Sequence, residues 1–193
     1  MTSKDYWENR WQKAQTGWDM AQVSPPIKAY IDTQSDIHQA ILIPGCGNAH
    51  EAEYLLQAGF TNITVIDIAP LPILYLKDKL HIAVKQGKLK VLCEDFFTHE
   101  GTYDLILEQT FFCAINPELR RSYAQHMHQL LKPHGKLVGV LFDKQFEAGP
   151  PFGGNTAEYL NYFTPLFSEV SITPCLNSIL PRMGSEVWME LIK

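Results

Sequence analysis

The segment of residues 41–59 constrains the fold most strongly, because an apolar run, two glycines and a helical pattern follow one another in it. Ile41–Pro44 predicts a short buried strand, and Gly45 and Gly47 predict a tight turn after it. Apolar residues then recur at helical spacing over 49–58. Glycines let the backbone approach a ligand closely, and the free N–H groups that begin a helix attract negative charge. This segment therefore predicts a strand, a turn and a helix that can form a ligand site.

A second apolar run, Ile63–Ile66, ends at Asp67, which lies 22 residues after Gly45. An acid about 20 residues beyond the glycine turn binds the ribose in nucleotide folds. The turn alone does not decide between a cofactor site and a plain connection, because it lacks the third glycine of the dinucleotide fingerprint and Ala49 only approximates it. Together with Asp67, it favours an adenosine-containing cofactor.

Length and composition fit a single domain over residues 1–193. A net charge of −5 argues against a nucleic-acid partner, which would require a basic stripe. Four cysteines without a CxxC pair read as reduced thiols of a cytoplasmic protein, and the seven histidines show no metal-ligand spacing. With no signal peptide, no membrane-length apolar run and no heptads, we expect a cytoplasmic monomer that takes a small-molecule substrate and binds neither metal nor membrane.

Residues 1–39 show no strand pattern and predict a helical extension. Trp7 and Trp11 share a face of a helix over 4–14, and Trp18 follows the next turn. A second helix is expected from Ser24 to Thr33, capped by Ser24. The tryptophans alone favour packing of the extension onto the core; the alternative is that a ring faces a sulfonium cation. We expect the extension to act as a lid that orders when the cofactor binds.

The rest of the chain, residues 40–193, alternates strands and helices and ends in a hairpin. Helices are expected over 70–86, 117–131 and 156–166, and strands over 89–93, 103–108, 136–142, 168–175 and 184–192. The last two strands leave no room for a helix between them and should pair antiparallel. This α/β pattern predicts a Rossmann-like, doubly wound sheet with one reversed strand, the class I methyltransferase architecture. A dehydrogenase would continue with parallel strands.

Two segments at strand ends carry candidate contacts. Asp95 and Phe96 directly follow the third strand, where the carboxylate suits the exocyclic amine of adenine and the ring suits stacking. A cap or turn acid is an equal alternative for Asp95. Residues 109–115 follow the fourth strand, at the sheet edge where open α/β sheets bind ligands.

Several motifs together resemble the thiopurine S-methyltransferase superfamily, in particular its bacterial members and the plant halide/thiol methyltransferases. The resemblance covers nearly the whole chain and rests on Trp7-Glu8-Asn9-Arg10-Trp11, Gly17-Trp18-Asp19, Pro25-Pro26, Pro44-Gly45-Cys46-Gly47, Asp95-Phe96-Phe97, Gln109-Thr110-Phe111-Phe112-Cys113-Ala114-Ile115 and Gly149-Pro150-Pro151-Phe152.

This resemblance implies a seven-stranded sheet and S-adenosylmethionine as the cofactor. By position it implies that Trp7, Trp11 and Trp18 cover the cofactor and that the turn of Gly45 and Gly47 approaches it closely. Asp67 would then bind the ribose, and Asp95 and Phe96 would hold the adenine. Gln109 would make a further contact with the cofactor. Pro44 stands where many other methyltransferases have an acid, so one contact of the general fold is missing.

A sulfonium already activates the methyl group, so the protein must align a soft nucleophile behind it and exclude water. A thiol, thiopurine, halide, or a selenium or tellurium species would be such an acceptor, and we expect no catalytic acid or base. The candidate acceptor pocket comprises Tyr6, Asp19, Phe111, Phe112 and Cys113, although a cysteine among apolar residues is usually a core side chain.

Two alternatives stay open from the sequence. A nicotinamide-dependent oxidoreductase would use the same turn and Asp67, but neither the third glycine nor a catalytic Tyr-Lys or His partner is found. A non-catalytic module that binds S-adenosylmethionine or its demethylated product would share every cofactor contact.

Overall fold

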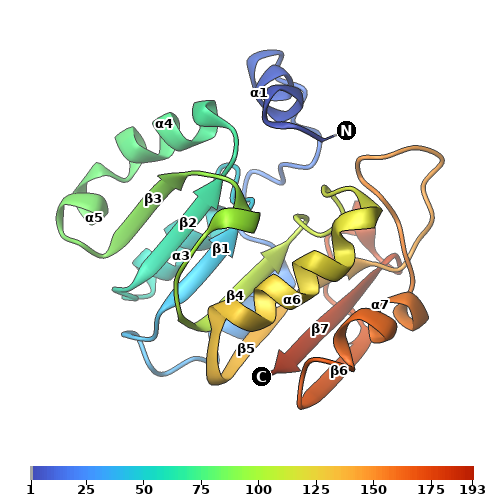
Figure 1. Ribbon diagram of the computed structural model, residues 1–193. Coiled ribbons are helices and arrows are strands. Elements are labelled where there is room, and N and C mark those ends of the chain that lie inside the picture. The colour runs from blue at the N-terminus through green and yellow to red at the C-terminus, as the bar shows by residue number, and fades with distance from the viewer. Residues whose placement is uncertain (1) are drawn as a thin grey trace.

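A computed structural model describes residues 2–193 and contains a single seven-stranded sheet (Figure 1). The strands are β1 Ile41–Pro44, β2 Ile63–Asp67, β3 Leu89–Cys93, β4 Tyr103–Gln109, β5 Leu131–Phe142, β6 Glu169–Pro174 and β7 Glu186–Ile192. Their order across the sheet is β3-β2-β1-β4-β5-β7-β6. The pairs among β1 to β5 are parallel, whereas β7 runs antiparallel to both β5 and β6. The predicted doubly wound sheet with one reversed strand is confirmed.

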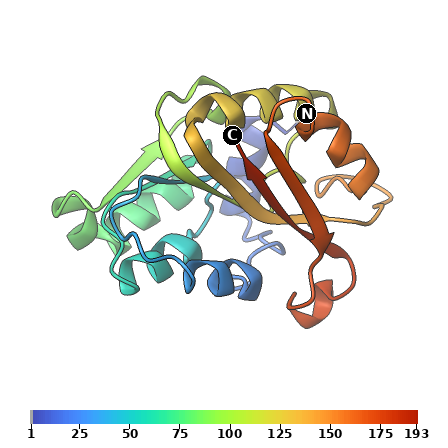
Figure 2. The same ribbon diagram turned by 90° about the horizontal axis from the view of Figure 1, so that it is seen from below.

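Helices cover both faces of the sheet. They are α1 Lys4–Gln12, α2 Pro25–Ile31, α3 His50–Gln57, α4 Pro70–Lys79, α5 His81–Lys85, α6 Arg120–Leu130 and α7 Thr156–Phe163, with short 3₁₀ helices at Phe96–Thr98, Pro117–Leu119 and Leu180–Arg182. Figure 2 shows α2 and α3 on one face and α6 and α7 on the other. Connections on both faces of a parallel sheet bury its strands completely, which explains their continuous apolar runs.

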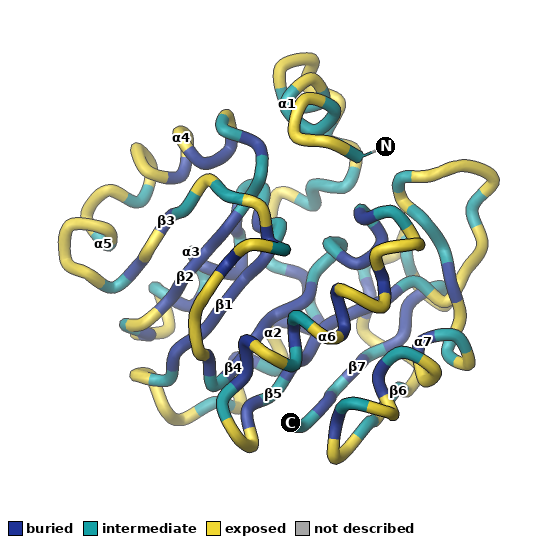
Figure 3. The backbone as a smooth tube through the Cα atoms, in the orientation of Figure 1, coloured by how far each residue is buried: buried dark blue, intermediate teal, exposed yellow. Residues whose placement is uncertain are grey.

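The two faces carry separate hydrophobic cores. Along β1, Ile41 and Ile43 belong to the cluster under α2 and α3, while Leu42 between them belongs to the cluster under α6 and α7. Successive side chains of a strand point to opposite faces, so each strand serves both cores. Figure 3 shows the central strands as the most continuously buried part of the chain.

The amino-terminal extension divides into two parts. Ile27 and Ile31 of α2 are buried in the core beside α3, whereas no residue of α1 is buried (Figure 3). Ser24 is the N-cap residue of α2 as expected, but its hydroxyl is buried without a hydrogen-bond partner and makes no capping hydrogen bond. Only the part before α2 therefore has the exposure expected of a lid.

Two predicted element boundaries also differ. The helix expected over 70–86 breaks at Leu80, whose φ of −107° and ψ of 23° leave the helical region and separate α4 from α5. Strand β5 begins at Leu131 and not at residue 136, because the pairing with β4 continues through an irregularity between Tyr103 and Leu105. Neither difference moves a strand end that faces the site.

Candidate functional site

A cavity of about 570 Å³ lies at the carboxyl ends of the central strands, and Trp7, Arg10 and Trp11 of α1 line part of it. This volume is in the range of pockets that enclose a small molecule or cofactor. Parallel strands of a doubly wound sheet end at a shared edge, where ligands bind. The predicted residues that the structure brings together around this cavity are Trp7, Trp11, Trp18, Gly45, Gly47, Asp67, Asp95, Phe96, Phe111 and Cys113.

The turn after β1 is shaped by both backbone geometry and packing. Gly45 and Gly47 have φ values of 57° and 49°, in the left-handed region that favours glycine. A Cβ on Gly45 would lie 2.3 Å from the ring of Phe111, and one on Gly47 would lie 3.3 Å from the ring of Trp11. The turn therefore lies against both the predicted lid and the segment after β4, and Gly45 has no room for a side chain.

Asp67 is fixed at the end of β2 by backbone donors. Its Oδ2 accepts a hydrogen bond from the N–H of Gly47 at 2.9 Å, and its Oδ1 accepts one from the N–H of Ala69 at 2.9 Å. Burial raises the pKa of Asp67 above its ordinary value, against the lowering effect of these backbone N–H groups. Each oxygen keeps a further lone pair, and the carboxylate lines the cavity as an oriented acceptor.

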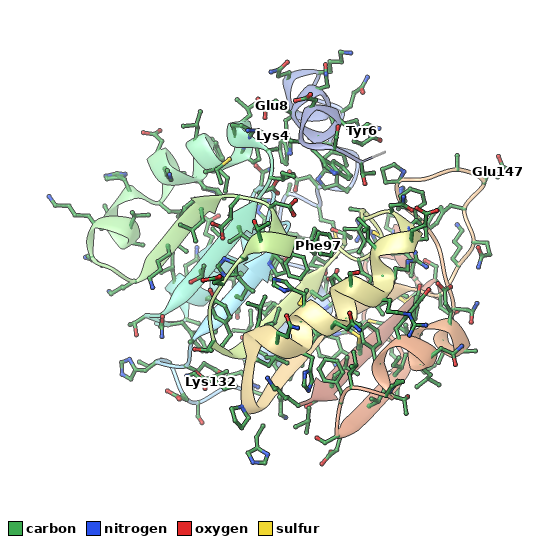
Figure 4. All side chains as sticks on the ribbon, viewed as in Figure 1. Lys4, Tyr6, Glu8, Phe97, Lys132 and Glu147 are labelled. Carbon is green, nitrogen blue, oxygen red and sulfur yellow. The ribbon has the colours of Figure 1, made fainter. Side chains whose placement is uncertain are left out.

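Asp95 has the capping role that the sequence left open, and it also lies at the cavity. Its Oδ1 accepts a hydrogen bond from the N–H of Phe97 at 2.9 Å and so caps the short helix Phe96–Thr98, while the residue also lines the cavity. Phe96 packs edge-to-face on Phe111, with the ring centroids 5.1 Å apart. Phe97 also lines the cavity, and Figure 4 shows it on the segment that follows β3.

Glu94 is a cavity residue that sequence reasoning missed. Its carboxylate is hydrogen-bonded to Nδ1 of His99, whose Nε2 lies 2.7 Å from the hydroxyl of Tyr103. His99 and Tyr103 are both buried. The Glu94 carboxylate is thus held in place from behind by two buried side chains.

The lid is an aromatic cluster tied down at both sides. Trp18 packs edge-to-face on Trp7 and Trp11, with centroid distances of 5.4 and 5.7 Å. On one side, Glu8 of α1 (labelled in Figure 4) accepts a hydrogen bond from the N–H of Leu71 at 3.1 Å. On the other side, the carbonyl oxygen of Trp18 accepts one from the guanidinium of Arg182 at 2.9 Å. These contacts hold the predicted lid, residues 4–20, against the rest of the protein.

Arg10 adds a positive charge to the cavity wall at the lid. Its guanidinium lies 5.3 Å from the centroid of the Trp18 ring and donates to the carbonyl oxygen of Gln15 at 3.1 Å. Tyr6, in contrast, stands beside Trp7 with ring centroids 5.1 Å apart and does not line the cavity. The expectation that Tyr6 belongs to the acceptor pocket is not supported by its position.

Phe112 and Asp19 also lie outside the main cavity. Phe112 is 1% exposed and packs among aromatic rings of α6 and α7, because it points into the core on the far side of its backbone. Asp19 accepts from the N–H of Ala21 at 2.8 Å and pairs with Nε2 of His50 at 2.7 Å. Asp19 therefore anchors the lid to the start of α3.

Gln109 lies in a small adjoining hollow of about 50 Å³, which it shares with Asp19 and the turn after β1. Its amide nitrogen and oxygen are both buried and have no hydrogen-bond partner among residues 2–193. Unpaired buried polar atoms are costly and uncommon in native proteins. The Gln109 amide is thus free to bind a polar ligand group.

The end of the cavity beyond β4 contains charged residues that sequence reasoning missed. They come from long connections: Lys144 follows β5, and Arg182 precedes β7. Lys144 shortly follows the end of β5, but no strand end, glycine turn or regular spacing marks Arg182. Cys113 lines the same end, and burial raises the pKa of its thiol to about 12, so it stays protonated near neutral pH.

Within residues 2–193, no group of histidine, cysteine, aspartate and glutamate side chains is arranged to hold a metal ion. None of the helices formed by these residues combines the length and the hydropathy that a bilayer crossing requires.

Solved structures of similar fold are methyltransferases, and one of the two described next holds the cofactor product. A TehB-like SAM-dependent methyltransferase from Corynebacterium glutamicum has a TM-score of 0.69 at 17% identity and covers 98% of this chain and 97% of its own. A 1,6-didemethyltoxoflavin N1-methyltransferase from Burkholderia thailandensis was crystallised with S-adenosylhomocysteine. It has a TM-score of 0.73 at 15% identity, and the match covers 98% of this chain and 86% of the chain of that enzyme. Together with the site, the fold defines an S-adenosylmethionine-dependent methyltransferase of class I.

The family follows from sequence comparison. The family described as Thiopurine S-methyltransferase (TPMT) matches residues 2–182. A probable thiol methyltransferase 2 of Arabidopsis thaliana is 32% identical over 93% of this chain and 81% of its own length, and a thiopurine S-methyltransferase of Vibrio cholerae is 27% identical over 98% of both. The chain belongs to the thiopurine S-methyltransferase family. This finding also decides against the nicotinamide-dependent oxidoreductase.

Proposed function

We propose that this enzyme transfers the methyl group of S-adenosylmethionine to a small, soft nucleophile that arrives as an anion, such as a thiolate or a halide. The observation that carries the proposal is the separation of charge in the cavity. Its carboxylates, Asp67, Glu94 and Asp95, stand at the ends of β2 and β3. Two of its three cations, Lys144 and Arg182, stand beyond β4 among apolar side chains, and the third, Arg10, lies over the Trp18 ring. Cations in a partly closed cleft attract an anionic acceptor.

The residues at the end of the cavity formed by β1, β2 and β3 fit the cofactor. The free lone pairs of Asp67 suit two ribose hydroxyls, and Asp95 with Phe96 suits adenine. The turn of Gly45 and Gly47 leaves space for the methionine part, whose polar groups the unpartnered amide of Gln109 can bind. Trp7, Trp11 and Trp18 would then cover the cofactor, and an aromatic face is a favourable neighbour for a sulfonium.

The chemistry required of the protein is positioning. When bound, S-adenosylmethionine supplies a methyl group already activated by its positive sulfur. Phe111 and Cys113 form the wall opposite the lid, and the lid tryptophans exclude water. No histidine lines the cavity, and its carboxylates all lie at the cofactor end, so no side chain is placed to remove a proton from the acceptor. A thiolate or halide needs no such group, which is why we favour an anionic acceptor.

Names of relatives support the same class of acceptor. One Arabidopsis thaliana relative, 30% identical over 93% of this chain, is called thiocyanate methyltransferase 1. Others are called thiol or thiopurine S-methyltransferases. Thiocyanate, thiolates and thiopurines share a polarisable sulfur, and halides or selenium and tellurium species share its softness.

We also propose a cytoplasmic monomer that does not bind nucleic acid. All four cysteines are free, and three of them are buried as thiols, as is usual in a reducing compartment. The net charge of −5 opposes a polyanionic partner. Light scattering during gel filtration tests the oligomeric state; a dimer mass at micromolar concentration would refute the monomer.

A methyl-transfer assay tests the proposed acceptor class. Labelled S-adenosylmethionine is incubated with iodide, thiocyanate, hydrosulfide, an aromatic thiol and a thiopurine, with an alcohol and an amine as hard controls. Turnover of the soft acceptors and none of the hard ones is expected. Tight cofactor binding without turnover of any acceptor would instead favour the non-catalytic binding module.

A further inference from the structure

Glu108, at the end of β4, is a fully buried carboxylate with no exposed surface. Its Oε1 accepts hydrogen bonds from the N–H groups of Phe111 at 2.8 Å and Phe112 at 2.9 Å. Its Oε2 accepts one from the hydroxyl of Tyr123 on α6. A buried carboxylate is costly even when it is hydrogen-bonded. Glu108 does not line the cavity, so it needs a role other than contact with a ligand.

The backbone that Glu108 holds is strained. Thr110 has a φ of 58°, in the left-handed region that β-branched residues rarely occupy. The chain reverses there, and two successive N–H groups turn inward to a single carboxylate oxygen. Such a conformation persists only where its surroundings fix it. The Glu108 carboxylate is the group that satisfies these two donors.

The segment fixed in this way lines the cavity and contacts both the glycine turn after β1 and the loop after β5. The Phe111 ring fills the space that a Cβ on Gly45 would occupy, at 2.3 Å. The carbonyl oxygen of Cys113 accepts a hydrogen bond at 2.7 Å from the N–H of Phe152, in the loop after β5. That loop, whose Pro150 and Pro151 line the cavity, is in turn held by the buried Arg120, which donates to the carbonyl oxygen of Gly153 at 2.8 Å.

We propose that Glu108 is a positioning residue for methyl transfer: its carboxylate fixes the backbone of residues 110–113 and thereby the wall that aligns the acceptor with the methyl group. A misalignment of the reacting atoms by about 1 Å can cost on the order of a hundredfold in rate. This inference rests on the proposed function for the nature of the acceptor, but the structural effect of Glu108 does not depend on it.

The protonation state of Glu108 should affect the pH dependence of kcat/KM, which a purely structural role would leave unchanged. Burial raises the pKa of Glu108 to about 7, against hydrogen bonds from Tyr123, Phe112 and Phe111 that favour the carboxylate. When Glu108 is ionised, both of its carboxylate oxygens accept hydrogen bonds. When it is protonated, Oε2 carries the proton and must donate a hydrogen bond, so the Tyr123 hydroxyl must turn to accept it. The wall is therefore held more firmly above pH 7 than below it.

Few other ionisable groups face Glu108. From α6 comes Tyr123, and from the segment after β4 comes Cys113; burial raises the pKa of both, so neither ionises between pH 5 and 9. Arg120 of α6, which stays positively charged, acts on Cys113. On β5, the residue paired with Glu108 is Gly139, which has no side chain. A transition near pH 7 can therefore be assigned to Glu108 if its substitution abolishes the transition.

The kinetic test compares the wild type with Glu108→Gln and Glu108→Leu, using iodide as the acceptor because iodide has no proton to lose. The wild-type kcat/KM should rise through an inflection near pH 7. Glu108→Gln keeps one oxygen for the two N–H groups, so its kcat/KM at pH 8 should stay within about threefold of wild type and show no inflection. Glu108→Leu should raise the KM for iodide at least tenfold, while the Kd for S-adenosylhomocysteine changes less than threefold.

A structural readout separates this proposal from the proposed function and from misfolding. With S-adenosylhomocysteine bound, amide hydrogen exchange of residues 110–114 should be at least tenfold faster in Glu108→Leu, with β1 and β2 unchanged. If Glu108→Leu does not fold, Tyr123→Phe serves instead: losing a donor to the carboxylate should move the inflection to higher pH. A wild-type inflection that persists in Glu108→Gln, or unchanged exchange and KM in Glu108→Leu, would overturn the proposal. If no acceptor is turned over, the proposed function fails, but the exchange result still decides the role of Glu108.

Discussion

The cofactor end and the acceptor end of the cavity differ in how the chain supplies their side chains. At the cofactor end, Asp67 and Asp95 stand directly at or after strand ends, and backbone N–H groups from adjacent turns fix them. At the acceptor end, Lys144 follows the end of β5, whereas Arg182 comes from the long connection before β7. There the support is a second tier of buried charge, formed by Glu108 and Arg120 behind the wall.

This difference suggests how one fold can keep its cofactor and change its acceptor. Strand ends of a buried parallel sheet barely move, so contacts made there are fixed with the sheet itself. Loops tolerate substitution and change of length, and here they are held by only a few buried polar contacts. The predictions below test whether the two ends are independent in this way.

The largest effect concerns the stability cost of Glu108. Its pKa of about 7 in the folded protein lies above the ordinary 4.5, so unfolding releases a proton between these values. Stability should therefore fall as pH rises from about 4.5 to 7, by ~3 kcal/mol relative to Glu108→Gln. Urea unfolding of both proteins from pH 4.5 to 8 measures this difference. The exposed Glu147→Gln, in the loop marked in Figure 4, is the control and should show no such trend.

At the cofactor end, Asp67→Ala should weaken binding of S-adenosylhomocysteine by roughly 30- to 150-fold, equivalent to about 2–3 kcal/mol for charge-assisted hydrogen bonds to a ribose. Calorimetric titration measures this loss. The exposed Asp78→Ala on α4 is the matched control and should bind as the wild type does. Unchanged affinity in a folded Asp67→Ala protein would remove Asp67 from the site.

At the acceptor end, Arg182→Ala should raise the KM for an anionic acceptor about tenfold, equivalent to ~1.4 kcal/mol, because a half-buried positive charge is lost. Because Arg182 also donates to the carbonyl oxygen of Trp18, the Kd for the cofactor product should rise as well, but by less than the KM. Arg121→Ala, on the exposed surface of α6, controls for the general loss of a cation. An equal loss of cofactor affinity in Arg182→Ala would show that the two ends are coupled.

The smallest effect is expected in the lid. With S-adenosylhomocysteine, hydrogen-exchange protection should rise several-fold over residues 4–20, because α1 has no buried residue and is held by contacts such as Glu8 with Leu71. Helix α2 should be protected in both states because Ile27 and Ile31 are in the core. Tryptophan fluorescence should change in parallel. Equal protection of residues 4–20 with and without ligand would mean that the tryptophans form a static wall.

The same contrast explains what the sequence could predict. Gly45 and Asp67 are visible because a strand, a turn and an acid recur at a fixed spacing, and the final hairpin is visible because two strand patterns adjoin. Arg182 is invisible because its place in the cavity depends on where a loop before β7 crosses the sheet edge. The prediction that Phe112 lines the acceptor pocket was wrong, because neighbouring residues of a turn point to opposite sides and the Phe112 ring lies in the core.

Some predicted boundaries failed for a related reason. Residues 132–135 contain proline and glycine, and the helix before them ends as predicted. The strand nevertheless begins at Leu131 and not at residue 136, because Leu131 pairs with Tyr103 of β4. The role of Glu108 could not be predicted either. An acid within an apolar strand pattern gives no sign that its carboxylate will accept hydrogen bonds from two backbone N–H groups of the next turn.

The most direct test of the central claim is a single experiment on the purified chain: competitive binding of S-adenosylmethionine and NAD, followed by product analysis with labelled methyl groups and the acceptor panel. The account predicts binding of S-adenosylmethionine without measurable binding of NAD, and stoichiometric formation of S-adenosylhomocysteine and a methylated soft anion. NAD binding as tight as that of S-adenosylmethionine, or methylation of only the hard alcohol or amine, would contradict it.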